Sequence, residues 1–236
     1  EARARVLVLD SKGLLVEGRA MEDYKRAYAQ PRARLAGWGE GSFDLAQTIE
    51  KGKATVLLGL SGQPHTFTEP MVRAMCANVE RPVVFPLSNP TSACEATPAD
   101  LLAWSRGRAI VATGSPFAPV RVGDKDQAIG QGNNAFIFPG LGFGSILAEA
   151  SEITDGMVLV ASYALAEYVA EKYLAAGLIY PPVEEMSEVA KRVATRVLQQ
   201  AFDDGVACTR KTTREGAAAY VRAKFWRAAY LPFVKA

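Results

Sequence analysis

Residues Phe85–Thr91 read Phe-Pro-Leu-Ser-Asn-Pro-Thr, and they combine the features of a strand end with those of a binding site. An apolar run leads into them, and the segment that follows, Cys94–Trp104, has the character of a helix. This order predicts a buried strand with Ser88 and Asn89 at its carboxyl end, where open α/β sheets bind their ligands. Pro90 lacks a backbone N–H and restricts the conformation of the residue before it, so the chain itself sets the direction of Asn89.

Four short aliphatic runs share this character, because each is bounded by turn residues. They are Arg5–Asp10, Ala54–Leu60, Pro82–Leu87 and Arg108–Thr113. Continuous aliphatic runs of this length are typical of strands covered on both faces. The last three runs alternate with the expected helices Phe43–Lys51, Glu69–Val79 and Thr97–Arg106. The alternation predicts an α/β fold with a doubly wound parallel sheet of the Rossmann type.

Each of the four runs ends in small or polar residues. The ends are Asp10-Ser11, Gly59–Gly62, Ser88-Asn89 and Thr113–Ser115. Because parallel strands end at the same edge of a sheet, we expect these residues to form one rim. One polar strand end on its own indicates nothing about function, because every strand has to end. Four such ends together favour a site for a polyanionic or dinucleotide ligand.

The pattern becomes helical near Gly130. Helices are predicted from Thr154 to about Ala176, over Met186–Ala201 and over about Glu215–Tyr230. We therefore expect a partial dinucleotide-binding domain over residues 1–132, a helical part of a substrate domain over 133–206, and a helical C-terminal tail over 207–236.

Composition excludes several classes of protein. Hydrophobic residues make up 49% of the 236 residues, which is enough for a sizeable core. Lys and Arg number 27 against 25 Asp and Glu, so the net charge of +2 offers no argument for a nucleic-acid or membrane partner. No uninterrupted apolar span reaches membrane length. The three cysteines are few and widely separated, which fits reduced thiols and a cytoplasmic location, with an organelle matrix as the alternative.

Asp10 bears on the cofactor. In a dinucleotide fold, an acid at the end of the second strand hydrogen-bonds a ribose hydroxyl, about twenty residues beyond a glycine-rich phosphate loop. Asp10 is only ten residues from the start and no such loop precedes it. In this role, the first strand and phosphate loop would lie upstream of Glu1. The alternative is an Asp that caps its own turn. Ser11 and Lys25 would contact the 2′-phosphate of an NADP-like cofactor. The alternative is that they are solvated surface groups.

Three amides, Asn89, Asn133 and Asn134, lie in stretches rich in Pro or Gly. A carboxylate or carboxamide ligand needs donors in fixed directions, and each amide offers two N–H groups. Asn133 and Asn134 are also ordinary turn formers. His65 is either an acid or base, or an exposed loop residue. The sequence contains no nucleophile constellation and no clustered carboxylates typical of a metal site.

Three motifs resemble the successive signatures of the malic enzyme family. They are Leu87-Ser88-Asn89-Pro90-Thr91, Ala112-Thr113-Gly114-Ser115-Pro116-Phe117 and the block Gly130–Gly140 (Gly-Gln-Gly-Asn-Asn-Ala-Phe-Ile-Phe-Pro-Gly). The segments Arg5–Gly18 and Gly177–Pro182 are similar to the family too. The similarity spans nearly the whole chain, in the family's order, and the third block is highly specific.

The resemblance implies oxidative decarboxylation of (S)-malate to pyruvate and CO₂, with NADP or NAD and a divalent cation, Mg²⁺ or Mn²⁺. It implies that Asn89 and Asn134 hold the substrate carboxylates and that Asn133 lies on the ribose and nicotinamide side of the cofactor. It further implies that Gly59, Leu60, Ser61 and Ser115 border the dinucleotide, with Asp10 and Ser11 at the adenosine ribose. Ser11 and Lys25 resemble the serine and lysine of NADP-using members, which favours NADP.

The resemblance also shows what this sequence does not match. The family's general acid tyrosine, base lysine, acidic metal ligands and phosphate-binding loop belong upstream, and nothing in the sequence corresponds to them. We therefore expect a carboxyl-terminal part of a malic enzyme that is inactive alone and belongs to a homo-oligomer when intact. The alternatives are a non-catalytic dinucleotide-sensing or interaction module, or part of a malolactic enzyme.

Overall fold

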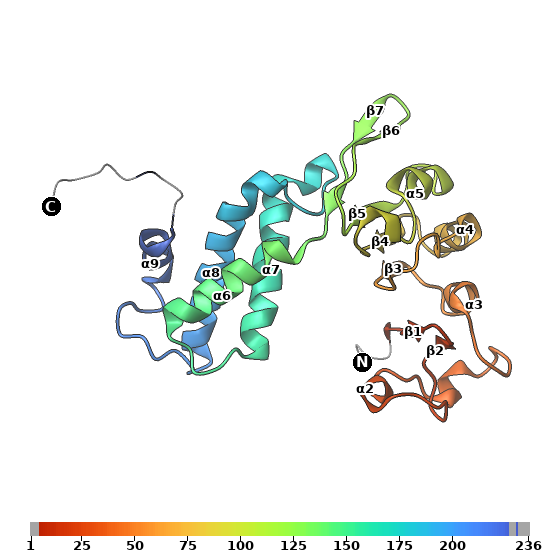
Figure 1. The fold of residues 1–236 in the computed structure, drawn as a ribbon, viewed down its shortest axis with the longest axis horizontal. Coiled ribbons are helices and arrows are strands. Elements are labelled where there is room, and N and C mark those ends of the chain that lie inside the picture. The colour runs from red at the N-terminus through yellow and green to blue at the C-terminus, as the bar shows by residue number, and fades with distance from the viewer. Residues whose placement is uncertain (1–4, 227–229, 231–236) are drawn as a thin grey trace. The chain divides into compact units, whose positions relative to one another are not determined.

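The computed structural model describes residues 5–226 and residue 230. The chain divides into two compact units, Glu1–Gly132 and Asn133–Ala236 (Figure 1). Unit 1 combines strands and helices around two clusters of buried side chains. Unit 2 is helical and has a core of its own. None of the helices in the described range combines the length and the hydropathy of a membrane span.

A four-stranded parallel sheet forms the centre of unit 1. Its strands are β3 (Val56–Gly59), β4 (Val83–Pro86), β5 (Ile110–Thr113) and β8 (Gly130–Gln131), in the spatial order β3-β4-β5-β8. The register aligns Leu57 with Val84 and Val84 with Val111, and all three side chains are buried. The predicted parallel α/β sheet is therefore confirmed.

Three helices pack on this sheet in chain order. They are α3 (Leu45–Lys51), α4 (Glu69–Asn78) and α5 (Pro98–Trp104), and each contacts the next. Their apolar side chains join those of the strands in one core that includes Ile49, Val72, Leu101 and Val84. The caps explain where the helices begin. Asp44 forms a capping box with Gln47 before α3, and the Thr97 hydroxyl accepts from the Asp100 N–H at the start of α5.

The first aliphatic run does not join the four-stranded sheet, and the prediction that it would is wrong for the described residues. Only β1 (Leu9–Asp10) is a strand, and it pairs antiparallel with β2 (Gly13–Leu14). Gly13 permits this reversal because its φ is +98° and a Cβ atom there would lie 2.5 Å from the Phe43 carbonyl oxygen. Asp10 is consequently at the tip of a hairpin, and β8 occupies the fourth place in the parallel sheet.

The outer edge of β3 is exposed. Among the described residues, β3 pairs with β4 and with no strand on its other side. Val56, Leu58 and Leu60 are 52%, 53% and 77% exposed, although they belong to a central aliphatic run. In β3 the exposed Val56 and Leu58 alternate with the buried Leu57 and Gly59. The described residues therefore cover one face and one edge of this strand and leave the other face and the other edge open.

The remaining elements of unit 1 are short. They are α2 (Asp23–Arg26), the 3₁₀ turns η1 (Arg32–Leu35) and η2 (Thr91–Ala93), and the hairpin β6 (Val120–Val122) and β7 (Lys125–Gln127). A small apolar cluster formed by Leu14, Val16, Leu35 and Phe43 holds the β1–β2 hairpin against the segment before α3.

Unit 2 is built around one helix, α8 (Met186–Asp203), against which α6 (Phe138–Ala148), α7 (Asp155–Lys172) and α9 (Ala217–Lys224) pack. The 3₁₀ turns of this unit are η3 (Asn134–Phe136), η4 (Leu174–Ala176) and η5 (Val183–Glu185). The predicted helix from Thr154 therefore ends at Lys172, four residues before Ala176. Of the predicted tail, residues 227–229 and 231–236 lie outside the described residues.

Two glycines allow α6 to approach α8 closely. A Cβ atom on Gly140 would lie 2.6 Å from Val193 Cβ, and one on Gly144 would lie 2.7 Å from the Ala194 carbonyl oxygen. Gly142, on the same helix, has open space at its Cβ position. The close spacing of α6 and α8 therefore depends on glycine, which has no side chain, at positions 140 and 144.

We expect Gly144→Ala to lower the free energy of unfolding by about 1–3 kcal/mol, because the methyl group meets the backbone of α8. Gly142→Ala is the matched control and should raise it by up to about 1 kcal/mol, since alanine favours helix where nothing clashes. Urea denaturation followed by circular dichroism measures both. Equal effects of the two substitutions would contradict the close packing of α6 on α8.

Candidate functional site

Polar side chains meet where β3, β4 and β5 end. Ser61 and Ser88 follow β3 and β4, and the Gly62 N–H donates to Ser88 Oγ at 2.8 Å. Ser115 follows β5, and its hydroxyl donates to Asn89 Oδ1. Three of the four predicted strand ends are thus linked by hydrogen bonds into one rim, as the parallel order requires.

The Asn89 amide is oriented by its bond to Ser115. Its carbonyl oxygen accepts from the serine hydroxyl, which leaves the two N–H groups of the exposed side chain for a ligand. Ser115 itself is buried, and its carbonyl oxygen accepts from the Thr113 hydroxyl at 2.8 Å. This arrangement provides donors in a fixed direction, as binding of a carboxylate requires.

Glu95 is a member of this rim that the sequence patterns did not predict. It is fully buried, and its carboxylate accepts hydrogen bonds from Ser61 and Ser88. Burial acts to raise the pKa of Glu95, but the bonds from Ser88 and Ser61 outweigh it and leave that pKa below its ordinary value. Glu95 lies between a cysteine and an alanine and belongs to no recognisable motif. The local sequence therefore gives no signal of its role.

The proposed cofactor residues at the end of β3 differ in exposure. Gly59 is buried, and a Cβ atom on it would lie 2.5 Å from the Glu95 carboxyl carbon. Leu60 is exposed, and Ser61 is exposed next to it. Gly59 therefore gives the Glu95 carboxylate its space, while the two residues that follow are accessible to a ligand.

Asp10 lies within a cluster of cations at the tip of the β1–β2 hairpin. Its Oδ2 atom is 2.5 Å from Arg19 Nη2 and 3.0 Å from Lys25 Nζ, and its Oδ1 atom accepts from the Lys12 N–H. Burial alone would raise the pKa of Asp10, but these hydrogen bonds, that from Lys25 first, lower it to about 2. Asp10 is therefore ionised at every physiological pH.

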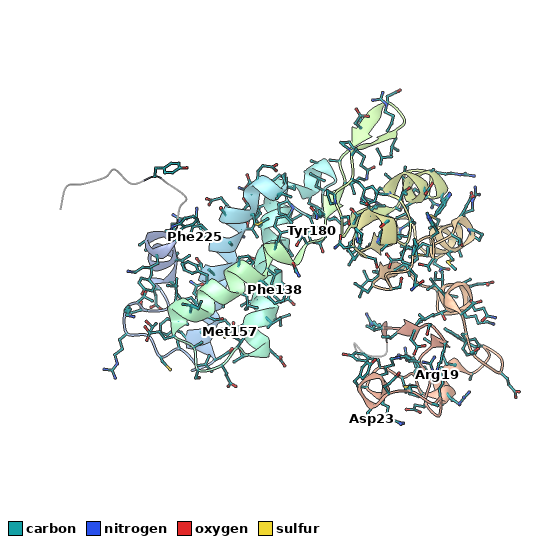
Figure 2. The ribbon with its side chains drawn as sticks, viewed as in Figure 1. Arg19, Asp23, Phe138, Met157, Tyr180 and Phe225 are labelled. Atoms are coloured by element: carbon teal, nitrogen blue, oxygen red, sulfur yellow. The ribbon has the colours of Figure 1, made fainter. Side chains whose placement is uncertain are left out.

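Arg19 is the second residue that the sequence patterns missed (Figure 2). Besides Asp10, it donates to the carbonyl oxygens of Gly13 and Leu14, which ties the hairpin to the segment that follows it. Lys25 is also paired with Glu22 at 2.9 Å, and both carboxylates raise its pKa. Ser11 is exposed beside this cluster. Asp10, Ser11 and Lys25 therefore lie close together, and Arg19 is a second cation on the Asp10 carboxylate.

Asn133 and Asn134 belong to unit 2. The Asn133 side chain is half-buried and accepts from the Ala135 N–H, so it caps η3. The Asn134 side chain is exposed at the first position of that turn. Asn133 thus has the turn-forming role that Gly-Asn sequences usually have, and this leaves its two amide N–H groups for other partners.

The described residues do not fit a metal site. Across residues 5–226 and 230, no group of three or more His, Cys, Asp or Glu side chains could hold a metal ion. His65 is exposed, and its backbone N–H donates to the Cys94 carbonyl oxygen.

The class of protein follows from this geometry. A parallel sheet with helices that return over it, and a polar rim at the carboxyl ends of its strands, defines an α/β protein of the Rossmann type. Residues 1–202 match the family model described as "Malic enzyme, NAD binding domain".

Curated relatives point to the same family. The chain is 42% identical over 232 residues to the NAD-dependent malic enzyme of Aeromonas salmonicida, which covers 98% of this chain and 41% of that protein. It is 40% identical over 233 residues to the NAD-dependent malic enzyme of Acinetobacter baylyi, with the same two coverages. The chain thus spans about two fifths of the length of these relatives.

Solved structures have a similar fold. The malic enzyme of Entamoeba histolytica is similar with a TM-score of 0.67 and 27% identity, over 92% of this chain and 41% of that one. The malic enzyme of Pyrococcus horikoshii has a TM-score of 0.64 at 24% identity, over 89% of this chain and 43% of that one, and shows the fold alone. The chain belongs to the malic enzyme family.

The ion pairs of Asp10 predict an acid-dependent loss of stability. Because the folded pKa of about 2 lies below the ordinary value of 3.8, the pairs contribute in full above about pH 4, and the contribution is lost as the pH falls towards 2. We expect Asp10→Asn to lower the free energy of unfolding at neutral pH by about 1–2 kcal/mol and to flatten its fall below pH 4.

Urea denaturation at a series of pH values from about 6 to about 2.5 measures this dependence. The control is Asp23→Asn, because the ion pair that Asp23 makes among the described residues is with exposed Arg26 and should contribute less than about 0.5 kcal/mol. An acid dependence in Asp10→Asn as steep as in the parent chain would contradict the assignment.

Proposed function

We propose that this chain is part of a malic enzyme, which oxidatively decarboxylates (S)-malate to pyruvate and CO₂ and reduces NAD or NADP. The observation that carries the proposal is 42% identity to an NAD-dependent malic enzyme across 98% of the chain. The polar rim supports it, because it offers hydrogen-bonding groups where α/β sheets take their ligands. The chain supplies part of the cofactor and substrate sites and is inactive alone.

The cofactor lies on residues 1–132 in this proposal. Gly59, Leu60, Ser61 and Ser115 border the dinucleotide, and Asp10 and Ser11 lie at the adenosine ribose. The Asp10 carboxylate supports this role, since it stays ionised and has acceptor capacity beyond its bonds to Arg19 and Lys25. Asn133 lies on the ribose and nicotinamide side of the cofactor.

The substrate carboxylates are held by Asn89 and Asn134. The bond from Ser115 supports the role of Asn89, because it turns both amide N–H groups towards a ligand. Donors of this kind orient malate through its carboxylates but do not move its protons. The base for the 2-hydroxyl and the acid for the enolate therefore come from outside the residues described here.

The divalent cation, Mg²⁺ or Mn²⁺, is likewise held elsewhere in the intact enzyme, since the described residues have no cluster fitted to it. The exposed edge of β3 supports a preceding part of the protein. A further strand alongside β3, ending in the phosphate loop, would pair with its open edge and complete the sheet. We propose that the intact enzyme is a cytoplasmic homo-oligomer, without nucleic-acid or membrane partners.

The proposal also concerns which of the two dinucleotides, NAD or NADP, is the principal cofactor. Ser11 and Lys25 favour NADP, because they suit a 2′-phosphate. The curated relatives are named NAD-dependent, and Lys25 is already engaged by Asp10 and Glu22. We therefore propose NAD as the principal cofactor, with NADP accepted through Lys25.

The isolated chain should give no malate-dependent reduction of NAD or NADP in the presence of Mn²⁺. The intact protein that contains it should give equimolar pyruvate and reduced cofactor. Absorbance at the reduced nicotinamide band and a pyruvate assay measure both. Turnover by the isolated chain would contradict the incomplete site, and lactate without net reduced cofactor would indicate a malolactic enzyme. Dinucleotide binding by the chain, with no upstream half encoded, would indicate a sensing module.

In the intact enzyme, Lys25→Ala should lower kcat/KM for NADP at least about tenfold, because a charge-assisted bond to the 2′-phosphate is lost. The value for NAD should change less than about threefold, since NAD lacks that phosphate. Arg26→Ala is the control, because exposed Arg26 forms its ion pair within the described part of the chain with Asp23 and not with Asp10. Equal losses for NAD and NADP in Lys25→Ala would contradict the role of Lys25.

A further inference from the structure

A buried carboxylate joins the two loops that carry the proposed ligand contacts. Glu95 follows η2 and precedes α5, and none of its surface is exposed. It touches the loop after β3 through Ser61 and the loop after β4 through Ser88. The two serines are 34 and 7 positions away in the sequence, so one side chain connects segments that only the fold brings together.

The hydrogen bonds to Glu95 have a defined polarity. Oε1 accepts from the Ser61 N–H at 3.0 Å, from Ser61 Oγ at 2.9 Å and from Ser88 Oγ at 2.5 Å, while Oε2 faces the Ser88 N–H at 3.4 Å. Every partner is a donor, which suits an ionised carboxylate that can only accept. Because Ser88 Oγ donates to Glu95, it is free to accept from the Gly62 N–H at 2.8 Å. The bonds therefore form one directed network from Glu95 to both loops.

Backbone contacts strengthen the same connection. The Phe67 N–H donates to the Glu95 carbonyl oxygen at 3.1 Å, and the His65 N–H donates to the Cys94 carbonyl oxygen at 3.3 Å. Gly59 completes the arrangement, because any side chain there would collide with the Glu95 carboxyl group. The end of β3 is thus shaped around this carboxylate.

Stability alone does not explain a buried charge of this kind. Removing a carboxylate from water costs several kcal/mol, and an apolar group of similar size often gives an equally stable core. A carboxylate does what an apolar group cannot, because it fixes the direction of several donors at once. Here those donors belong to the residues that border the proposed ligand.

We propose that Glu95 is a positioning residue that holds the loops after β3 and β4 in the shape that binds cofactor and substrate. The proposal rests on the function proposed above. Glu95 has no accessible surface, so it touches neither ligand. It acts through Ser61, which borders the dinucleotide, and through Ser88, whose neighbour Asn89 holds a substrate carboxylate.

The test is steady-state kinetics of the intact enzyme carrying Glu95→Gln. The amide replaces one acceptor oxygen with a donor, so the side chain at position 95 can no longer accept all the hydrogen bonds from Ser61 and Ser88. We expect KM to rise at least about fivefold for both the dinucleotide and malate, with kcat changed less. Thr97→Ala is the control, because it removes the cap of α5 two residues away. It should lower stability but leave both KM values unchanged.

A second pair of variants answers the same question if Glu95→Gln does not fold. Ser61→Ala removes one hydroxyl bond to Glu95 and should raise KM for the dinucleotide, whereas Ser61→Thr keeps the hydroxyl at an exposed position and should restore it. Unchanged KM values in Glu95→Gln, or equal values in the two Ser61 variants, overturn the positioning role alone. A parent enzyme without malate-dependent turnover overturns the proposed function and this inference with it.

Discussion

Parallel pairing of β3, β4 and β5 is the constraint on which the rest of unit 1 depends. Neighbouring strands that run in the same direction need a connection that crosses back over the sheet, and α4 and α5 provide it. Each strand then delivers its last residue to the same edge. Ser61, Ser88 and Ser115 are far apart in the sequence, and they meet because their strands share a direction and a register.

The sequence predicted the parts of this sheet whose signal is local. Covered strands have continuous apolar runs, so β3, β4 and β5 were identified together with the helices between them. Arg5–Asp10 has the same composition, but composition does not specify a partner, and the turn at Gly13 directs β1 to its own return strand. The fourth strand, Gly130–Gln131, has two residues and no hydrophobic pattern, so its place follows only from the register with Ala112 and Thr113.

The candidate site also contains residues that the local sequence predicted and residues that it did not. Serine and asparagine at strand ends were predictable, because a parallel sheet brings all such ends to one edge. Glu95 and Arg19 were not, since their roles come from contacts with residues distant in the sequence and from the burial of a charge. The roles of Asn133 and Asn134 in ligand binding stay predictions, because they come from the resemblance to the family.

The outer edge of β3, which pairs with no strand in the described part of the chain, also affects how the chain behaves in solution. A strand edge presents unpaired N–H and C=O groups to any other extended segment, and Val56, Leu58 and Leu60 add apolar surface beside them. Such an edge is a template for pairing with a second copy of the chain. In the intact enzyme proposed above, the strand that completes the sheet would occupy this edge and would therefore also protect the chain against self-association.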